Sequence, residues 1–421
     1  MAKANNLTAP VEIWRRIFEH ALDHPKLHYS CAPEDLYQFI NNYSSLGDDS
    51  ETVYRSLRAV CRSWKALAEE FIHREALLRI RSSTSTCLHL SRASRLQCHW
   101  YSKLPPGSFH HWLSEATPKL TILDITIMVN GESEKLLLDA LSATSSLSSI
   151  RSLRLRWQGR NQPSLSSHIS ISFTTLVSLE LGNLSWPLEP LVLPKLEILI
   201  AEIWQVPGVD LTCWSLPALR MLGVRAGHHG QGFNYGILRP ITTKVEALAI
   251  INIERNYAIA QSLKQINMNL FENFPALRIL FTRDVPFIVK DPIPIDHPLA
   301  EVHLSNSYAI NPVSLLELTS SDHGSFDHTI RFIADSVTWK DIRTKFSDDN
   351  ELQRLVHRHL FLNLELVDKH GRSFKEFTRE EDRQFLLSID RRSSEEDNVD
   401  SPTLGLRLVG ACRSYLAKAY S

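Results

Sequence analysis

The 421-residue sequence lacks the features that define several large protein classes. It has six cysteines and no Cys-x-x-Cys pair, which is too sparse for a disulfide scaffold, so reduced thiols in an intracellular protein are expected. No apolar run approaches the roughly 18 residues of a membrane span. The first residues contain no apolar segment of the kind found in signal peptides. Secreted and membrane-embedded proteins are therefore not expected.

Neither sign of charge is in excess. Lys and Arg number 46, Asp and Glu number 47, and the formal charge is -1. Nucleic acids and anionic membranes usually bind basic surfaces, so neither is expected as the main partner. Apolar residues make up 43% and charged residues 22%, which is typical of globular rather than disordered chains. At roughly 150 residues per domain, the length suggests two or three units or one long array of repeats.

The sequence also has no motif for catalysis or for a cofactor. It contains no His-Glu-x-x-His, no Gly-x-Ser-x-Gly and no phosphate-binding loop ending in Lys-Ser/Thr. Cys61 lies on the apolar stripe of an expected helix, so we interpret it as a small core residue rather than a nucleophile. The histidine pairs have poor spacing for a shared metal: His110 and His111, His228 and His229, His357 and His359. We predict no catalytic residue, no metal and no cofactor, and hence no enzyme.

The first 80 residues predict a small helical module. Residues 9–23 carry apolar side chains at helical spacing, with charged residues on the opposite face. A second amphipathic helix is expected over residues 53–71. The polar stretch between them, about residues 24–52, reads as an insert. Each apolar stripe includes a tryptophan, so both helices are expected to bury much of their surface.

The middle of the sequence repeats one pattern, apolar-x-x-Leu-x-apolar. Eight units share it, and their fourth positions are Leu123, Leu153, Leu179, Leu199, Leu222, Leu248, Leu280 and Val302. The units begin 20 to 32 residues apart, and most of these spacings fall in the roughly 20–29 range of a leucine-rich repeat, while the two longest imply longer connections. Each unit predicts a strand with its fourth and sixth positions pointing inward, and stacked units would form one parallel sheet over a continuous core. The alternative is an irregular α/β domain whose strands merely look alike.

Beyond residue 310 the repeated pattern fades. We assign residues 81–310 to the repeat array and residues 311–421 to its C-terminal end and cap. Residues 388–401 are rich in serine and acidic residues and are expected to form a mobile, solvated loop. The further elements expected here are strands at 329–334 and 362–366 and a helix at 350–359.

Two segments at the N-terminus together resemble an F-box. They are residues 9–18, Ala-Pro-Val-Glu-Ile-Trp-Arg-Arg-Ile-Phe, and residues 57–64, Leu-Arg-Ala-Val-Cys-Arg-Ser-Trp. The family pattern is Leu-Pro-x-Glu-Ile, then Ile-Phe, then Val-Cys-Arg-x-Trp. Ala9 replaces the usual leucine, and the stretch between the segments is longer than the compact family pattern. With its repeats, the whole sequence resembles an F-box/leucine-rich-repeat protein, the fungal type of F-box domain-containing protein.

This resemblance implies a function. It implies that residues 1–80 bind a Skp-type adaptor, and through it a cullin scaffold, so that the chain is the substrate-recognition subunit of an SCF-type ubiquitin ligase. The positions that match the family motif, some of which must form the core of the module, are Pro10, Ile13, Ile17, Phe18, Leu57, Val60, Cys61 and Trp64. The alternatives are a helical cap on the array, a stand-alone repeat scaffold without a ligase, and an enzyme on an irregular α/β domain.

The protein substrate is expected on the strand face. The fifth and seventh positions of each unit point away from the fourth, because side chains alternate along a strand. Most are polar, but Ile200, Ile251 and Phe281 interrupt them beside Arg225 and Arg283. Exposed apolar residues edged by arginine are typical of binding hot spots, so these five are the predicted substrate-binding residues. The alternative is that the C-terminal segment of the chain covers them.

Overall fold

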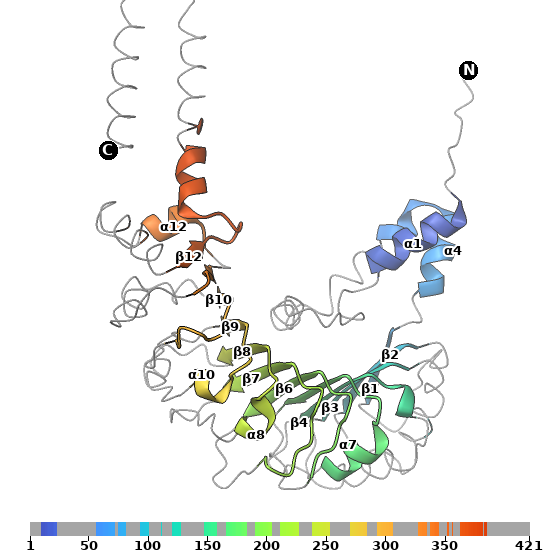
Figure 1. The fold of residues 1–421 in the computed structure, drawn as a ribbon. Coiled ribbons are helices and arrows are strands. Elements are labelled where there is room, and N and C mark those ends of the chain that lie inside the picture. The colour runs from blue at the N-terminus through green and yellow to red at the C-terminus, as the bar shows by residue number, and fades with distance from the viewer. Residues whose placement is uncertain are drawn as a thin grey trace, which may run out of the picture. The chain divides into compact units, whose positions relative to one another are not determined.

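The structure is a computed structural model, and contacts divide it into two units, Met1–Lys369 and His370–Ser421, which we describe separately (Figure 1). The predicted insert, the loop at 388–401 and most of the expected helix at 350–359 lie outside the described residues. The structure describes residues 10–22, 56–71, 75–80, 93–100, 111, 120–127, 147–157, 166–182, 190–203, 211–226, 238–252, 270–283, 293–305, 327–334, 337–344, 352, 356, 363–381 and 383–384.

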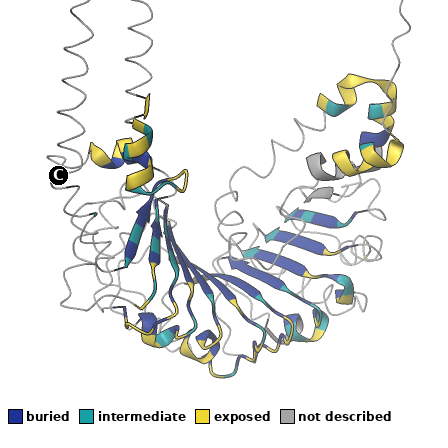
Figure 2. Ribbon diagram, turned by 45° about the horizontal axis from the view of Figure 1, so that its top comes forward, coloured by how far each residue is buried: buried dark blue, intermediate teal, exposed yellow. Residues whose placement is uncertain are grey.

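One twelve-stranded sheet dominates the first unit. Its strands lie side by side in the order of the chain, and each is parallel to the next (Figure 2). They are β1 (Glu75–Ile80), β2 (Arg95–Trp100), β3 (Ile122–Ile127), β4 (Ser152–Trp157), β5 (Ser178–Gly182), β6 (Ile198–Ile203), β7 (Met221–Ala226), β8 (Ala247–Asn252), β9 (Ile279–Arg283), β10 (Glu301–Ser305), β11 (Ile330–Ile333) and β12 (Leu364–Val367).

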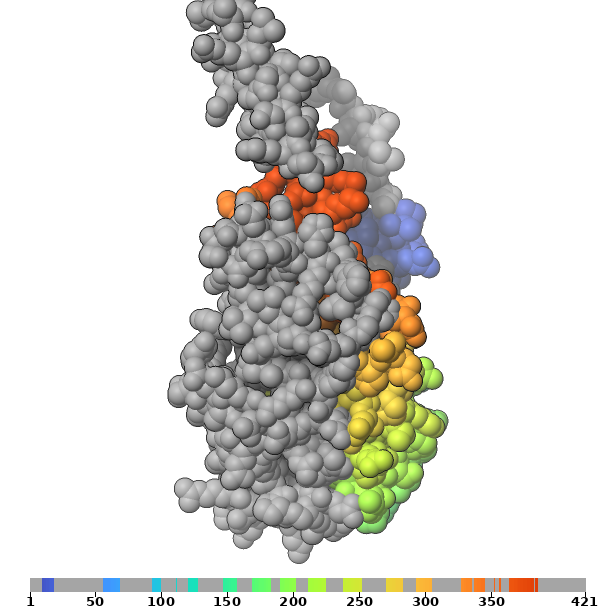
Figure 3. All heavy atoms as spheres, turned by 60° about the vertical axis from the view of Figure 1, so that its left-hand side comes forward, coloured from blue at the N-terminus to red at the C-terminus, as the bar shows by residue number. Residues whose placement is uncertain are grey.

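Short helices occur in the connections between the strands, which makes the unit an α/β structure. Three of them lie along one side of the sheet (Figure 1): α7 (Ser166–Ser172), α8 (Arg239–Thr242) and α10 (Leu270–Asn273). The 3-10 helix η3 (Leu147–Ser149) precedes β4, and α12 (Trp339–Arg343) lies between β11 and β12. In the space-filling view, the described segments coloured green, yellow and orange lie next to one another in the order in which they occur along the chain (Figure 3).

The fourth positions of the repeated pattern form a continuous buried row. Leu123 lies in register with Leu153, Leu153 with Leu179, and the pairing continues to Val302. All eight side chains are 0–1% exposed. The prediction of one strand per unit in one parallel sheet is therefore confirmed. In a parallel sheet with a covered face, the side chains that point to that face are all buried. A register shift of one residue would expose the leucine, so one leucine per unit is enough to fix the alignment of the next strand.

A tight turn precedes several strands and explains the prolines of the pattern. The first apolar residue of a unit donates its N–H to the carbonyl three residues earlier, in the pairs Leu196–Leu193 at 3.2 Å, Leu219–Leu216 at 3.1 Å and Leu277–Phe274 at 3.1 Å. Pro194, Pro217 and Pro275 occupy the second position of these turns. The proline ring restricts φ to the value that this position requires, so the turn is favoured before the strand begins.

Polar side chains join the starts of neighbouring strands. The Ser149 hydroxyl donates to the Leu120 carbonyl at 2.9 Å, and the Thr175 hydroxyl donates to the Ile150 carbonyl at 3.3 Å. These bonds satisfy backbone carbonyls in the turns, where the sheet has no ladder partner for them. Each one links a repeat to the repeat before it.

The sheet extends beyond the eight predicted units at both ends. β11 and β12 confirm the strands expected at 329–334 and 362–366. β1 and β2 were not predicted, because β2 carries arginine, glutamine and histidine between its apolar residues and β1 falls within the expected helical module. The sheet thus runs across both expected domain boundaries, at residues 80 and 310, whereas the contacts divide the chain after Lys369.

The N-terminal segment forms helices, with one difference from expectation. α1 (Val11–Leu22) lies within the predicted range, but the second predicted helix is divided into a helical stretch at 56–60 and α4 (Arg62–Phe71). Cys61 lies at the break. Its carbonyl accepts the Lys65 N–H at 2.9 Å and its sulfur accepts the Trp64 N–H at 3.4 Å, so it caps α4. Cys61 is exposed, and its interpretation as a core residue is wrong.

Two helix starts near the C-terminal end of the described chain went unpredicted, although both have a capping box. In the first unit, Thr338 and Asp341 bond reciprocally at the start of α12: the Asp341 N–H donates to the threonine hydroxyl at 3.2 Å, and the Thr338 N–H donates to the carboxylate at 2.8 Å. In the second unit, Ser373 and Glu376 do the same at the start of a helix over 374–381. The Ser/Thr-x-x-Asp/Glu spacing is the feature of the sequence from which both helix starts could have been predicted.

Candidate binding surfaces

A compact aromatic cluster holds α1 and α4 together. Phe18, Leu67 and Ala68 are 0%, 6% and 0% exposed, and Trp14 and Trp64 pack against them. The Trp64 ring contacts the Trp14 ring at a centroid distance of 4.8 Å and the Phe18 ring edge-on at 5.2 Å. Aromatic side chains bury large areas and favour such tilted geometry, so this cluster is the core of the helix pair.

Other apolar side chains of the same helices face solvent. Ile13 and Ile17 are 46% and 44% exposed, and four residues apart they share one face of α1. Val11 is 44% exposed and Val60, on the helical stretch at 56–60, is 58% exposed. The helix pair therefore presents branched apolar residues that its own core does not use.

The structure separates the eight predicted adaptor-binding residues into two groups. Phe18 is buried, and Leu57 and Trp64 are partly buried in the cluster between the helices. These three stabilise the pair, a division that helical periodicity could not make because both groups lie on one broad apolar stripe. The remaining five are exposed: Pro10, Ile13, Ile17, Val60 and Cys61.

The predicted substrate-binding residues lie on four neighbouring strands, β6 to β9, but their expected exposure is wrong for three of them. Ile200, Ile251 and Phe281 are 1%, 8% and 3% exposed. They belong to a buried apolar cluster on the strand face, which we call the apolar section: Ile198, Ile200, Met221, Ala247, Ala249, Ile251, Ile279 and Phe281. On these strands, the described side chains that point away from the leucine row are therefore buried rather than exposed to water.

Small residues let the apolar section close. Gly223 lies in register between Ile200 and Ala249, and Ala249 lies in register with Phe281. A Cβ on Gly223 would lie 2.9 Å from Cγ1 of Ile200, so the isoleucine occupies the space that the glycine leaves. Phe281 also contacts the His303 ring at a centroid distance of 4.4 Å. Two small residues on neighbouring strands thus lie between two large side chains, an arrangement that fits the close packing of a protein interior.

The two predicted arginines lie on either side of one residue of this section. Arg225 on β7 and Arg283 on β9 are each in register with Ile251 on β8. The backbone positions of the two predicted arginines thus lie next to Ile251 on the neighbouring strands, each at the seventh position of its unit.

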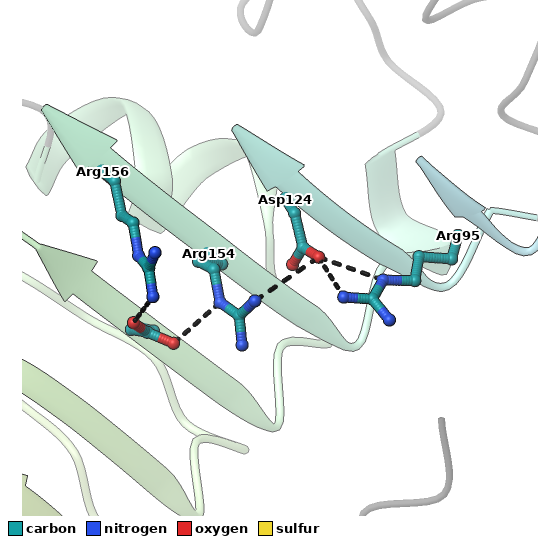
Figure 4. A network of polar contacts seen from close by, with 5 residues as sticks. Arg95, Asp124, Arg154 and Arg156 are labelled. Carbon is teal, nitrogen blue, oxygen red and sulfur yellow. Dashed lines mark hydrogen bonds and ion pairs between the residues drawn. The ribbon is translucent and has the colours of Figure 1, made fainter. Parts of the chain in front are cut away.

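A buried ionic network covers the same face of the sheet on β2 to β5; we call it the charged section. Two carboxylates lie among three guanidinium groups, and these five side chains come from four strands (Figure 4). Arg95 donates to Asp124 Oδ2 from Nη2 at 2.6 Å and from Nε at 3.0 Å. Arg154 lies 3.7 Å from the same oxygen. Arg95 and Asp124 are only 3% and 8% exposed.

The network continues from Arg154 to Glu180. The Arg154 Nε–H donates to Glu180 Oε2 at 2.8 Å, and Arg156 approaches Oε1 at 3.5 Å. Asp124, Arg154 and Glu180 are in direct register on three strands, so their charges alternate in sign from strand to strand. Buried charges need partners with good geometry, and opposite charges in register supply them. The sequence shows the alternating charges at the fifth positions of these units, but it does not show that the three side chains are buried.

A third section of the same face, on β10 to β12, carries charges that remain partly solvated. Arg331 lies 3.3 Å from Glu301 and 3.4 Å from Glu365, and the side-chain exposures of these three residues are 42%, 25% and 36%. Glu301 lies in register with Arg331, and Arg331 lies in register with Glu365. Water screens such pairs, so they contribute little to stability.

The described residues do not assemble a metal site. Within them, no three His, Cys, Asp or Glu side chains are placed to hold a metal ion. Of the histidine pairs noted in the sequence, only His111 is described. The described cysteines Cys61, Cys98 and Cys213 are not joined by disulfide bonds. Among the described helices, none is both long and apolar enough to cross a membrane.

These surfaces must be interpreted from their own geometry. The sequence matches no protein-family model and gives no significant match to a curated protein.

Proposed function

We propose that this protein is an intracellular substrate-recognition subunit of a cullin-based, SCF-type ubiquitin ligase. The helix pair of α1 and α4 acts as an F-box and docks a Skp-type adaptor. The parallel sheet is a leucine-rich-repeat solenoid with irregular repeats, and it holds the protein substrate. The chain itself is a binding subunit, without catalysis or a cofactor.

The observation that carries this proposal is the division of the helix pair. Ile13, Ile17 and Val60 match the F-box pattern, yet they are 46%, 44% and 58% exposed while the aromatic cluster already forms a core. Scattered exposed apolar residues are common on protein surfaces. Here they coincide with the motif positions, and burying them against a partner would be favourable by roughly 25 cal/mol per Å² of apolar area.

The sheet supports the second half of the proposal. Its buried leucine row, its chain-order strands and its repeated turns are the expected features of a solenoid, in which each repeat contacts its neighbours and the strands present one extended surface. We place the substrate contact at Arg225 and Arg283. Ile200, Ile251 and Phe281 support that surface from within, because they are buried.

The adaptor interaction is testable with the full chain. The double change Ile13→Asp with Ile17→Asp puts two charges on an exposed apolar face, and we expect adaptor binding to weaken at least about tenfold, or ~1.4 kcal/mol. The matched control is Arg16→Ala, which changes an exposed charged residue of the same helix and is expected to leave the affinity unchanged. Isothermal titration calorimetry measures both, and circular dichroism verifies folding.

A core variant separates docking from folding. Phe18→Ala removes a fully buried aromatic ring, a loss that costs about 3–5 kcal/mol in a core, so the helix pair should unfold and binding should be lost together with helicity. If the wild-type chain fails to bind the adaptor at micromolar concentration, the ligase proposal is wrong. A repeat scaffold that acts without a ligase would then be the better interpretation.

A further inference from the structure

A buried histidine lies in the turn that leads into β10. His297 is 5% exposed, and both of its ring nitrogens bond to the backbone. Nδ1 accepts the N–H of Leu299 at 3.2 Å, and Nε2 lies 3.0 Å from the Phe274 carbonyl. Since Nδ1 accepts a hydrogen bond and a carbonyl oxygen can only accept one, this geometry requires the neutral ring with its hydrogen on Nε2.

The imidazole thereby joins two repeats. Phe274 belongs to the turn before β9, and Leu299 lies two residues before the first residue of β10. A second histidine continues the connection, because His328 Nε2 lies 2.7 Å from the Leu299 carbonyl. Leu299 is therefore held through its N–H by one histidine and through its carbonyl by the next.

The surroundings of His297 favour the uncharged ring. Burial lowers its pKa below the usual 6.5, against the hydrogen bond to Phe274 and the charge of Asp296, which raise the pKa, while nearby His328 lowers it further. The Phe271 ring of α10 packs edge-on against the imidazole at a centroid distance of 4.9 Å. Glu272 is the acidic residue of α10. The outcome is a lowered pKa.

We propose that the His297 turn is a pH-sensitive latch at the start of β10. Protonation of Nδ1 removes the acceptor for the Leu299 N–H and places a positive charge among apolar groups. The start of β10 is then released from the preceding repeat. The strand face of β10 to β12, with its partly solvated charges, loosens in an acidic environment, whereas the preceding repeats do not.

The direction of the effect follows from proton linkage. Because the folded-state pKa of His297 is lowered, the unfolded state binds more protons than the folded state between that pKa and 6.5. The stability that neutral His297 supplies is thus complete above pH 6.5. It is lost as the pH falls through the folded-state pKa.

Hydrogen exchange on the full chain tests the latch. Amide protection over residues 297–305, corrected for intrinsic exchange rates, should fall about fivefold between pH 7.5 and pH 5.5, the effect of losing one hydrogen bond. His297→Asn keeps a short side-chain acceptor but does not titrate, so in this variant the amide protection of residues 297–305 should not change with pH. The control His370→Asn alters an exposed histidine of the second unit and should behave like the wild type.

Three results would overturn the latch. One is a pH dependence in His297→Asn equal to that of the wild type. If this variant does not fold, an NMR titration of the wild-type chain decides instead. The His297 ring should then titrate below 6.5, and the Leu299 amide should shift with it. Titration at or above 6.5, or a Leu299 amide that does not follow the ring, would show that no latch exists.

Discussion

The charged section on β2 to β5 and the apolar section on β6 to β9 occupy the same face of one sheet, yet they are built from opposite chemistry. Asp124 and Glu180 are 8% and 2% exposed, and Ile200 and Phe281, at the same position of their units, are 1% and 3% exposed. In these two sections, charged and apolar side chains are therefore buried to the same extent. What each section requires is a suitable neighbour on the next strand, an opposite charge in one case and a complementary volume in the other.

The two sections should respond differently to mutation. In the charged section, removing one partner leaves a desolvated charge behind, which costs more than the net contribution of the pair. In the apolar section, the cost comes from lost contacts or from overpacking, and neighbours can relax to reduce it. Single substitutions on neighbouring strands distinguish these responses.

The largest effect is expected for Asp124→Ala. It removes the carboxylate that bonds Arg95 at 2.6 Å and lies 3.7 Å from Arg154, both buried, and should lower the free energy of unfolding by about 3–5 kcal/mol. Urea unfolding of the full chain followed by circular dichroism measures it. Arg331→Ala, in the solvated section, is the matched control. Equal losses in both variants would show that burial of the ionic network does not matter.

An intermediate effect is expected for Gly223→Ala in the apolar section. The new methyl group would lie 2.9 Å from Cγ1 of Ile200, and overpacking of this kind costs about 1–3 kcal/mol. Combining it with Ile200→Ala removes the clashing atom, so the double variant should be less destabilised than the sum of the two single variants. Strict additivity in the urea midpoints would contradict direct packing between these positions.

The smallest effect is expected for Glu365→Ala on β12. Its single ion pair with Arg331 spans 3.4 Å at 36% and 42% side-chain exposure, and Arg331 retains Glu301, so stability should change by about 0–1 kcal/mol. The change should shrink further in 1 M salt, where exposed charges are screened. A loss as large as that of Asp124→Ala would remove the distinction between buried and solvated ionic rows.

The repeated leucine pattern was enough to predict the strands because every unit carries its own alignment signal. Leu123 and its counterparts recur at one position, and a proline marks the turn before several of them. Cys61 shows the limit of such reasoning. Its place on an apolar stripe favoured a core role, but the helix breaks there and its sulfur caps α4. A local hydrogen bond competed with helical periodicity and prevailed.

By itself the sequence determined the strands of the leucine row, the two strands that follow them and the amphipathic helix α1, because periodicity of apolar residues reports which side of each element faces a core. Only the tertiary structure decided the rest. Burial of Ile200 and Phe281 depends on neighbours that lie many residues away along the chain, and so does the pairing of Asp124 with Arg154. The division of the helix pair into Phe18 inside and Ile17 outside likewise depends on where the second helix lies.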